Sequence, residues 1–252
     1  MDKLVEDVSA RLSERQQADG HWVFELEADA TIPAEYILYK AFLAEDIEPA
    51  LAAKIGVYLR RIQNPDGGWP LFHRGDFDMS ASVKAYYALK MIGDDTDAEH
   101  MARARAAIHG HGGAEKSNVF TRILLALFGQ VPWRAVPVMP VEIMLLPRWF
   151  PFHMSKVSYW SRTVIAPLLV LMTEKPQARN PKGVGIAELF VTPPDKVRHY
   201  HSNPTGSIWG AMLLRIDTLL RLIEPRLPRR ARQRAIDRAM AFTRERLNGE
   251  DG

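Results

Sequence analysis

The stretch that decides the fold is QNPDGGWPLF, from Gln63 to Phe72. Pro65 ends the helix predicted before it, because an X-Pro step moves the preceding residue out of the α region. The Asp-Gly-Gly sequence at 66–68 then favours a turn, since glycine takes positive φ without steric cost. The turn ends on Trp69, the largest apolar side chain. A second turn of the same kind elsewhere in the chain shows that this tryptophan belongs to a repeat.

A similar turn occurs earlier in the chain, with the same internal spacing. Gln16 precedes Trp22 by six residues and Gln63 precedes Trp69 by six, and the two units lie 47 residues apart. A further 46 residues on, HGHGG at 109–113 is a similar glycine-rich turn without the tryptophan. A fixed period of this size indicates stacked supersecondary units.

Each unit contains two segments in which apolar residues recur at helical spacing. The predicted helices are 5–16 and 32–46 in the first unit, 48–63 and 78–93 in the second, and 98–113 and 117–129 in the third. Gly93 is the expected stop of its helix. Convincing strand-type alternation is absent, so the sequence predicts an all-α fold of helical hairpins, arranged as a solenoid or a closed α/α barrel.

The glutamine and tryptophan of each turn are interpreted as structural residues. A helix C-terminus leaves several carbonyl groups unpaired. We expect the Gln16 and Gln63 side chains to hydrogen-bond backbone groups at the start of the next helix, while Trp22 and Trp69 cover them and exclude water. The turns are not expected to be catalytic.

Composition narrows the class of protein. The 252 residues are 47% hydrophobic and 25% charged, as in a soluble globular protein, and the net charge of +3 is too small to indicate nucleic acid as a partner. The lack of cysteine excludes disulfides, cysteine-ligated zinc and a thiol nucleophile, and fits a reducing compartment. No signal peptide is visible, and the longest apolar run, 163–172, is too short to span a bilayer.

Metal and cofactor sites are not expected. The pairs His109/His111 and His199/His201 have a spacing that can ligate a metal on a strand, but neither has a third ligand in an obvious place. Phosphate-binding loops, dinucleotide glycine fingerprints and nucleophile elbows are absent. We predict no metal ion and no cofactor.

Residues 206–234 combine an apolar helical face with a run of arginines. The apolar face comprises Ile208, Trp209, Met212, Leu213, Ile216, Leu219, Leu220 and Ile223. The arginines cluster from Arg226 to Arg234. This pattern favours an interfacial helix that enters one leaflet of a membrane. The alternatives are that the face packs on the protein's own core and that the arginines form a solvated helix face.

The turn pattern Q-x(3)-G-x-W resembles the QW repeat of triterpene cyclases. The segments AEYILYKAFL, DFDMSASVKAYYALKMIG, SNVFTRILLALFGQVPW, VPVMPVEIMLLP and SYWSRTVIAPLLVLM are similar to the N-terminal part of bacterial squalene-hopene cyclases. The resemblance is collinear from Leu4 to Gly252. It implies one domain over 1–252, an N-terminal α/α barrel whose last repeat is incomplete and whose first residues pack on a second barrel.

The resemblance also implies what this chain lacks. The family's initiating acid is an Asp-x-Asp-Asp motif in the second barrel, and neither 76–79 nor 94–97 matches it. We therefore expect the 252 residues alone to be inactive. Asn248 stands where the next repeat would have glutamine, and Gly252 stands two residues before the expected tryptophan. We interpret this end as a truncated reading frame, a fragment of a split gene or a cloning boundary.

Site residues follow from the resemblance alone. Trp160 aligns with a tryptophan that lines the family's cavity, where aromatic faces stabilise carbocations by cation–π attraction; the alternative is an ordinary core tryptophan. Val157 and Ile165 fall near the region that forms the substrate channel.

Glu35 and Arg122 align with polar residues that the family keeps in its interior, where an ion pair or water network would satisfy them. The alternative is a surface pair. Lys84 stands where many relatives carry glutamate, so an interior network here would differ in charge.

The same resemblance implies partners and location. The 208–223 helix corresponds to a monotopic membrane anchor, so the expected partners are squalene or a related polyene, the membrane surface, a second cyclase domain and a second copy in a homodimer. The expected location is the cytoplasmic face of a membrane. A stand-alone isoprenoid-binding or scaffold module is the alternative. A protein prenyltransferase β subunit shares the architecture but needs a cysteine ligand for its zinc.

Overall fold

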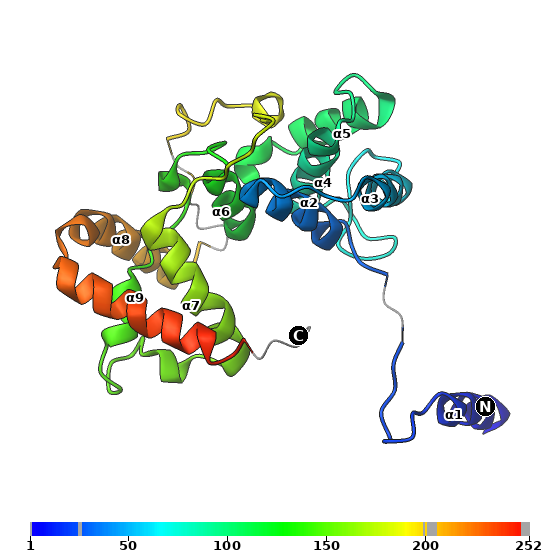
Figure 1. Ribbon diagram of the computed structural model, residues 1–252, viewed down its shortest axis with the longest axis horizontal. Helices are drawn as coiled ribbons and strands as arrows, with labels where there is room; N and C mark the ends of the chain where they lie inside the picture. The colour runs from blue at the N-terminus through cyan, green and yellow to red at the C-terminus, as the bar shows by residue number, and fades with distance from the viewer. Residues whose placement is uncertain (1, 25–26, 199, 201–205, 248–252) are drawn as a thin grey trace.

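The structure is a computed structural model (Figure 1), and it describes residues 2–24, 27–198, 200 and 206–247, without the side chain of Trp209. His199, His201, Asn248 and Gly252, on which parts of the sequence interpretation depend, lie outside these residues. Within this part of the chain all regular structure is helical, and the one β-type pairing is an isolated antiparallel bridge between Trp69 and Asp78. The all-α prediction is confirmed.

All six helices predicted from the three repeat units are present. Their bounds are α1 Asp2–Glu14, α2 Thr31–Leu43, α3 Pro49–Arg61, α4 Met79–Ile92, α5 Glu99–Gly110 and α6 Val119–Leu127. Three further helices follow: α7 Tyr159–Glu174, α8 Ile208–Ile223 and α9 Arg229–Arg244. Short 3₁₀ segments connect them: η1 Ala114–Lys116, η2 Trp133–Ala135, η3 Val141–Leu145, η4 Met154–Lys156, η5 Ala187–Leu189 and η6 Glu224–Arg226.

Local chemistry explains where α4 begins and ends. The Asp78 side chain accepts a hydrogen bond from the backbone N–H of Ala81, and so pairs one of the donors that a helix N-terminus leaves free. At the other end Gly93 has φ of 110°, a left-handed conformation that ends the helix as predicted. Asn118 caps α6 in the same way as Asp78 caps α4, through the N–H of Thr121.

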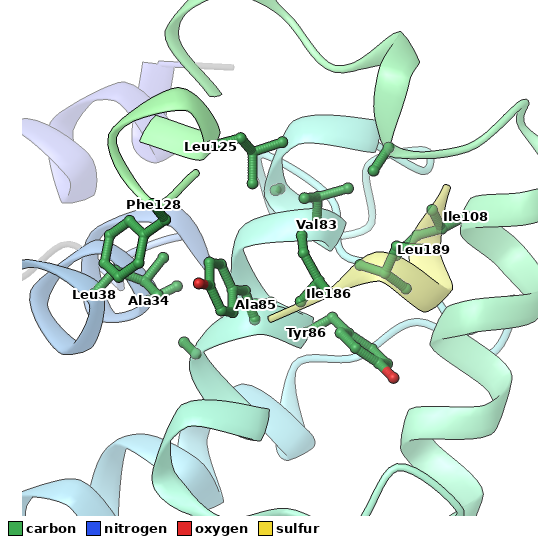
Figure 2. Close-up of a cluster of buried hydrophobic side chains, with 14 of the residues drawn as sticks. Ala34, Leu38, Val83, Ala85, Tyr86, Ile108, Leu125, Phe128, Ile186 and Leu189 are labelled. Atoms are coloured by element: carbon green, nitrogen blue, oxygen red, sulfur yellow. The ribbon is translucent and has the colours of Figure 1, made fainter. Parts of the chain in front are cut away.

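The larger hydrophobic core surrounds α4. This helix is buried on nearly every side, and its buried residues include the polar Ser80, Ser82 and Lys84. Helices α2, α3 and α5 pack directly on it. Figure 2 shows buried side chains of this core, which come from α2, α4, α5, α6 and η5.

A smaller core holds the second half of the chain together. Its buried members are Val141, Met144, Met154, Leu169, Ala235 and Ala239, from η3, η4, α7 and α9. Because the two alanines are small, α9 can approach α7 and η3 closely, and it packs against both. A closed α/α barrel is not visible in the described residues and remains an implication of the resemblance.

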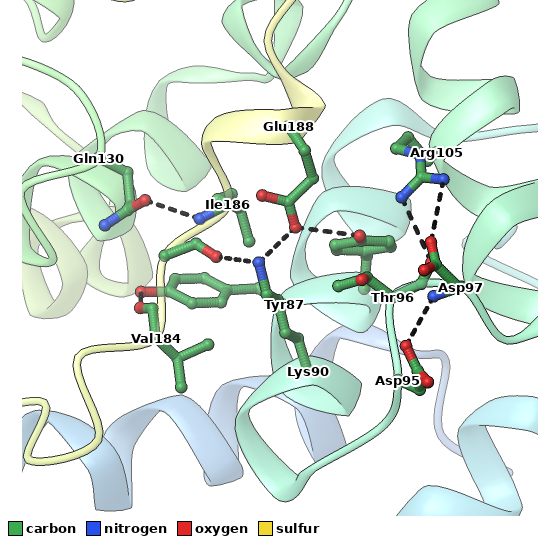
Figure 3. Close-up of polar contacts among 12 residues, drawn as sticks. Tyr87, Lys90, Asp95, Thr96, Asp97, Arg105, Gln130, Val184, Ile186 and Glu188 are labelled. Atoms are coloured by element: carbon green, nitrogen blue, oxygen red, sulfur yellow. Dashed lines mark hydrogen bonds and ion pairs between the residues drawn. The ribbon is translucent and has the colours of Figure 1, made fainter.

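The irregular segment 177–192, which we call the strap, lies across the larger core. Lys90 Nζ donates to the carbonyl oxygen of Gly185 (2.7 Å) and to Glu188 Oε1 (2.5 Å), as Figure 3 shows. Tyr87 donates to the carbonyl oxygen of Val184 (2.9 Å), and Tyr86 donates to Glu188 (3.0 Å). The sequence assigned no structure to the strap, because its order comes from contacts with residues far away in the chain.

Helix α1 is separate from both cores. Every residue from 2 to 24 is exposed, and Figure 1 shows α1 apart from the other helices. Its apolar residues, Leu4, Val5, Val8 and Leu12, are therefore open to solvent in this chain.

Candidate functional site

The two glutamine–tryptophan turns share one hydrogen-bond pattern. Trp69 Nε1 donates to the carbonyl oxygen of Leu59 (2.8 Å), and Trp22 Nε1 donates to that of Leu12 (2.7 Å). Both carbonyls lie in the last turn of a helix, where the regular N–H partner four residues on is lost; the carbonyl oxygen of Leu12 also accepts from the N–H of Arg15 at 3.1 Å. Each tryptophan therefore caps the helix that precedes its turn, a role that the sequence reasoning missed.

The glutamines act within the same turns. Gln63 Nε2 donates to the carbonyl oxygens of Gly67 and His100, both at 2.8 Å, and His100 lies in the first turn of α5. Gln16 Nε2 donates to the carbonyl oxygen of Gly20 at 2.6 Å, a bond within its own turn. The Gln63 turn therefore ties α3 to α5, whereas the Gln16 turn is closed only on itself and on the end of α1.

Glu35 and Arg122 do not pair with each other. The Glu35 carboxylate, on α2, accepts a hydrogen bond from Lys84 Nζ of α4 at 2.7 Å. The Lys84 side chain is only 9% exposed, whereas that of Glu35 is 51% exposed. Lys84 is therefore a buried cation whose carboxylate partner is half exposed.

Arg122 lies on α6 and is buried. Its guanidinium donates through Nη1 to the carbonyl oxygen of Tyr200, while its Nε is buried without a partner among the described residues. Burial lowers the pKa of Arg122 from its ordinary value, because a charged group loses hydration there. The described structure gives it no carboxylate partner.

The residues expected at the substrate cavity are not gathered in one pocket of this chain. Trp160, in the first turn of α7, is 76% exposed and belongs to neither core, so the alternative of a core tryptophan is wrong for the described structure. Val157 is half-buried just before α7. Ile165 packs against the smaller core. Trp160 instead forms part of an exposed surface.

Helix α8 is held to the body by its polar side. Asp217 accepts hydrogen bonds from the backbone N–H of Val138 (2.7 Å) and from Arg221 Nε (2.8 Å). Arg221 Nη2 donates to the carbonyl oxygen of Val136 (2.9 Å). This arrangement leaves Ile208, Met212 and Leu213 exposed, whereas Ile216 and Leu220 are half-buried. Trp209 lies in α8, with its side chain outside the described part.

A cavity of ≈ 1090 Å³ lies between α8 and the segment 137–146. Its walls are mostly apolar and include Ile143, Phe150, Leu213, Ile216 and Leu220. Polar side chains, among them Arg122, Glu115 and Asp217, also line it. The cavity could hold a long apolar molecule.

The histidines that the structure describes do not form a metal centre. His109 Nε2 lies 2.7 Å from the carbonyl oxygen of Glu188, and His111 Nδ1 lies 2.8 Å from that of Ala107. The His111 ring stacks on Phe77, with ring centroids 3.9 Å apart. Within residues 2–24, 27–198, 200 and 206–247, no three His, Asp or Glu side chains are grouped to bind a metal ion.

No helix in the described ranges is both long and apolar enough to cross a bilayer.

Comparison with known proteins identifies the family. The sequence-family model described as the squalene-hopene cyclase N-terminal domain matches residues 5–252. The chain is 62% identical over 238 residues to a squalene-hopene cyclase of Bradyrhizobium diazoefficiens, which covers 94% of this chain and 36% of the relative. It is 54% identical over 252 residues to that of Zymomonas mobilis, covering all of this chain and 38% of the relative.

A more distant relative is the squalene-hopene cyclase of Alicyclobacillus acidocaldarius, 34% identical over 197 residues that cover 78% of this chain and 31% of the relative. The chain thus spans little more than a third of the length of the curated relatives it matches. Its helical hairpins, its capped glutamine–tryptophan turns and these matches agree, and the chain belongs to the squalene-hopene cyclase N-terminal domain family.

Proposed function

We propose that this chain is the N-terminal part of a cyclase that converts squalene, or a related polyene, into a hopene-type triterpene. Residues 1–252 form one domain that supplies one wall of the reaction cavity and the contact with the membrane. A further cyclase domain supplies the Asp-x-Asp-Asp acid, which no segment of this chain contains. The 252 residues alone are then inactive.

The observation that carries this proposal is the exposure of Trp160. Leaving a tryptophan 76% exposed forgoes the free energy of burying one of the largest apolar side chains. Together with its neighbour Tyr159, which is 58% exposed, Trp160 forms an open aromatic surface of the kind that another domain or a ligand can cover. Its ring would face the polyene and stabilise cationic intermediates through its π system.

Helix α1 supports the same arrangement. The turn after α1 is closed by the same tryptophan-to-carbonyl bond as the turn of the second unit. Trp22 is nevertheless 46% exposed, whereas Trp69 is fully buried. A preformed amphipathic helix with an open apolar side is suited to packing on a further domain. We propose that the second cyclase domain covers it.

The cavity beneath α8 gives the polyene a route from the membrane. The polar bonds of Asp217 and Arg221 face the body, so exposed apolar residues of α8 can enter a leaflet. Ile216 and Leu220 line the cavity on the inner side. The chain would then lie peripherally on the cytoplasmic face of the membrane. The homodimer stays an untested prediction. The comparisons give no support to a stand-alone binding or scaffold module.

Domain exchange with a relative tests the proposal. The matched N-terminal segment of the Bradyrhizobium cyclase is replaced by residues 5–252 of this chain, and conversion of squalene is followed by gas chromatography. We expect the hybrid to form a triterpene and the 252-residue chain to form none. A W160A hybrid should lose most of its activity.

The matched control is W149A, because Trp149 is also 76% exposed. This variant should keep most of the hybrid's activity. A folded hybrid without activity, turnover by the 252-residue chain alone, or equal activities of W160A and W149A would contradict the proposal.

A further inference from the structure

The junction of α8 and α9 exposes apolar and basic side chains together. Leu219, Leu222 and Ile223, at the end of α8, are all exposed. Arg226, Arg229, Arg230 and Arg234, within the next eleven residues, are exposed as well. We call these four the junction arginines.

The two acidic residues nearest the junction pair with a different arginine. Arg232 has Nε 3.1 Å from Glu142 Oε1 and Nη2 3.9 Å from Glu224 Oε1. Neither carboxylate forms an ion pair with a junction arginine, although the single charge of Arg232 offsets only one of the two. Asp237, farther along α9, accepts a hydrogen bond from Gln233 at 2.9 Å.

The junction arginines have no carboxylate partner in the described part of the chain. Arg226 donates only to the carbonyl oxygen of Leu222, and Arg229, Arg230 and Arg234 form no ion pair among the described residues. Four guanidinium groups without a paired carboxylate raise the local positive potential. Each one near an anionic bilayer adds about 1 kcal/mol of attraction, or roughly a fivefold gain in binding.

We propose that the junction arginines bind the phosphates of anionic phospholipids and make membrane binding selective for acidic bilayers. This inference deepens the proposed membrane contact and rests on it. The exposed leucine and isoleucine side chains enter the acyl boundary, while the guanidinium groups stay at the depth of the phosphates, which they can bind bidentately. These contacts also fix the orientation of the chain on the membrane, because they hold the basic end of α8 at the level of the headgroups.

Vesicle flotation of the 252-residue chain tests this. The probes are vesicles of phosphatidylcholine alone and vesicles of equimolar phosphatidylcholine and phosphatidylglycerol, at low and at high salt. The test variant is R229Q/R230Q/R234Q, because none of these side chains makes a hydrogen bond or an ion pair in the described part of the chain. The matched control is K3Q/R11Q/K54Q, which removes three exposed positive charges elsewhere. Circular dichroism checks that both variants are folded.

We expect the parent and the control to bind the acidic vesicles far more tightly than the neutral ones. The test variant should lose on the order of 100-fold on acidic vesicles, following about fivefold per arginine, and change little on neutral ones. High salt should weaken the parent's binding, because it screens exposed charges.

Equal binding of the parent to both vesicles, or full retention by the test variant, would overturn the anionic selectivity and leave the apolar membrane contact standing. No binding to either vesicle would overturn both. A duplex oligonucleotide at equal phosphate concentration is the competitor: displacement of the chain from acidic vesicles by it would show a nucleic-acid surface and overturn the assignment to lipid.

Discussion

Trp69 Nε1 donates to the carbonyl oxygen of Leu59, ten residues earlier, and Trp22 Nε1 makes the same bond to the carbonyl oxygen of Leu12. The two bonds differ by only 0.1 Å in length, at 2.8 and 2.7 Å. Burial distinguishes them, because Trp69 is fully buried whereas Trp22 is 46% exposed. The local bond is therefore a property of the repeat, and the packing around it is a property of the fold.

The paired variants W69F and W22F separate the contribution of the tryptophan hydrogen bond from that of burial. W69F removes a buried donor and leaves a void, so it should lower the free energy of unfolding by about 2 kcal/mol. W22F should cost less than about 1 kcal/mol, since water can satisfy the carbonyl of Leu12. Urea unfolding followed by circular dichroism measures both. Equal losses would show that burial does not decide the cost.

Gly67 is required for space as well as for backbone conformation. A Cβ there would lie 2.6 Å from the carbonyl oxygen of Arg103, and Gly67 has φ of 91°. Gly93 has φ of 110° but nothing within 4 Å of such a Cβ, so G93A is the matched control. G93A should cost about 1–2 kcal/mol for the left-handed conformation, and G67A at least about 1 kcal/mol more for the clash. Equal thermal stabilities of G67A and G93A would refute the steric part.

Asp94 should make the protein's stability depend on acid pH. Burial of its carboxylate opposes ionisation, but hydrogen bonds from Arg60 and His100 outweigh it and lower the pKa of Asp94 below its ordinary value of 3.8. A carboxyl group whose pKa is lower in the folded state stabilises the fold above its unfolded pKa, and this contribution is lost as pH falls through the folded pKa.

The variant D94N should therefore lower the free energy of unfolding by about 2 kcal/mol near pH 5.5, and the difference from the parent should shrink as the pH falls below about 4. Denaturant titrations across this range measure it. D97N is the control, since the Asp97 side chain is 87% exposed and should contribute little. A difference that stays constant down to pH 2 would contradict the expected linkage.

Replacing Glu35 and replacing Lys84 should change the free energy of unfolding by unequal amounts. E35Q leaves a buried ammonium without its carboxylate and should cost about 1 kcal/mol, a figure reduced by the exposure of Glu35. K84M removes the buried charge and should change stability by less than about 1 kcal/mol in either direction. The double variant E35Q/K84M should match K84M in urea unfolding. A K84M variant less stable than E35Q would show that the cation itself is required.

The repeat explains how much of the fold was predictable. Six helices could be located from Gln16, Gln63 and the glycine turns, because helical periodicity and turn chemistry act over only a few residues. The strap could not be located, because Lys90, Tyr86 and Tyr87 bind it from about a hundred residues away. No local pattern marks a segment whose order is supplied by a distant helix.

The candidate site was predicted less completely. The apolar side of α8 was visible in the spacing of Ile208, Met212 and Ile216, since that spacing is local. That Asp217 and Arg221 anchor the helix to 136–138 was not visible, because their partners are backbone groups, the N–H of Val138 and the carbonyl oxygen of Val136. The pairing of Glu35 with Lys84, 49 positions apart, was also missed.

By itself, the sequence determined the helical repeat, the positions of its glutamine–tryptophan turns and the family, because each depends on residue types at short fixed spacings. Only the tertiary structure decided which tryptophans are buried, which charges are paired and which apolar faces stay open. Burial and ion pairing depend on which distant segments come together, so Trp69 and Trp160 cannot be distinguished by residue type. One is enclosed by packed helices, and the other is left exposed on the surface.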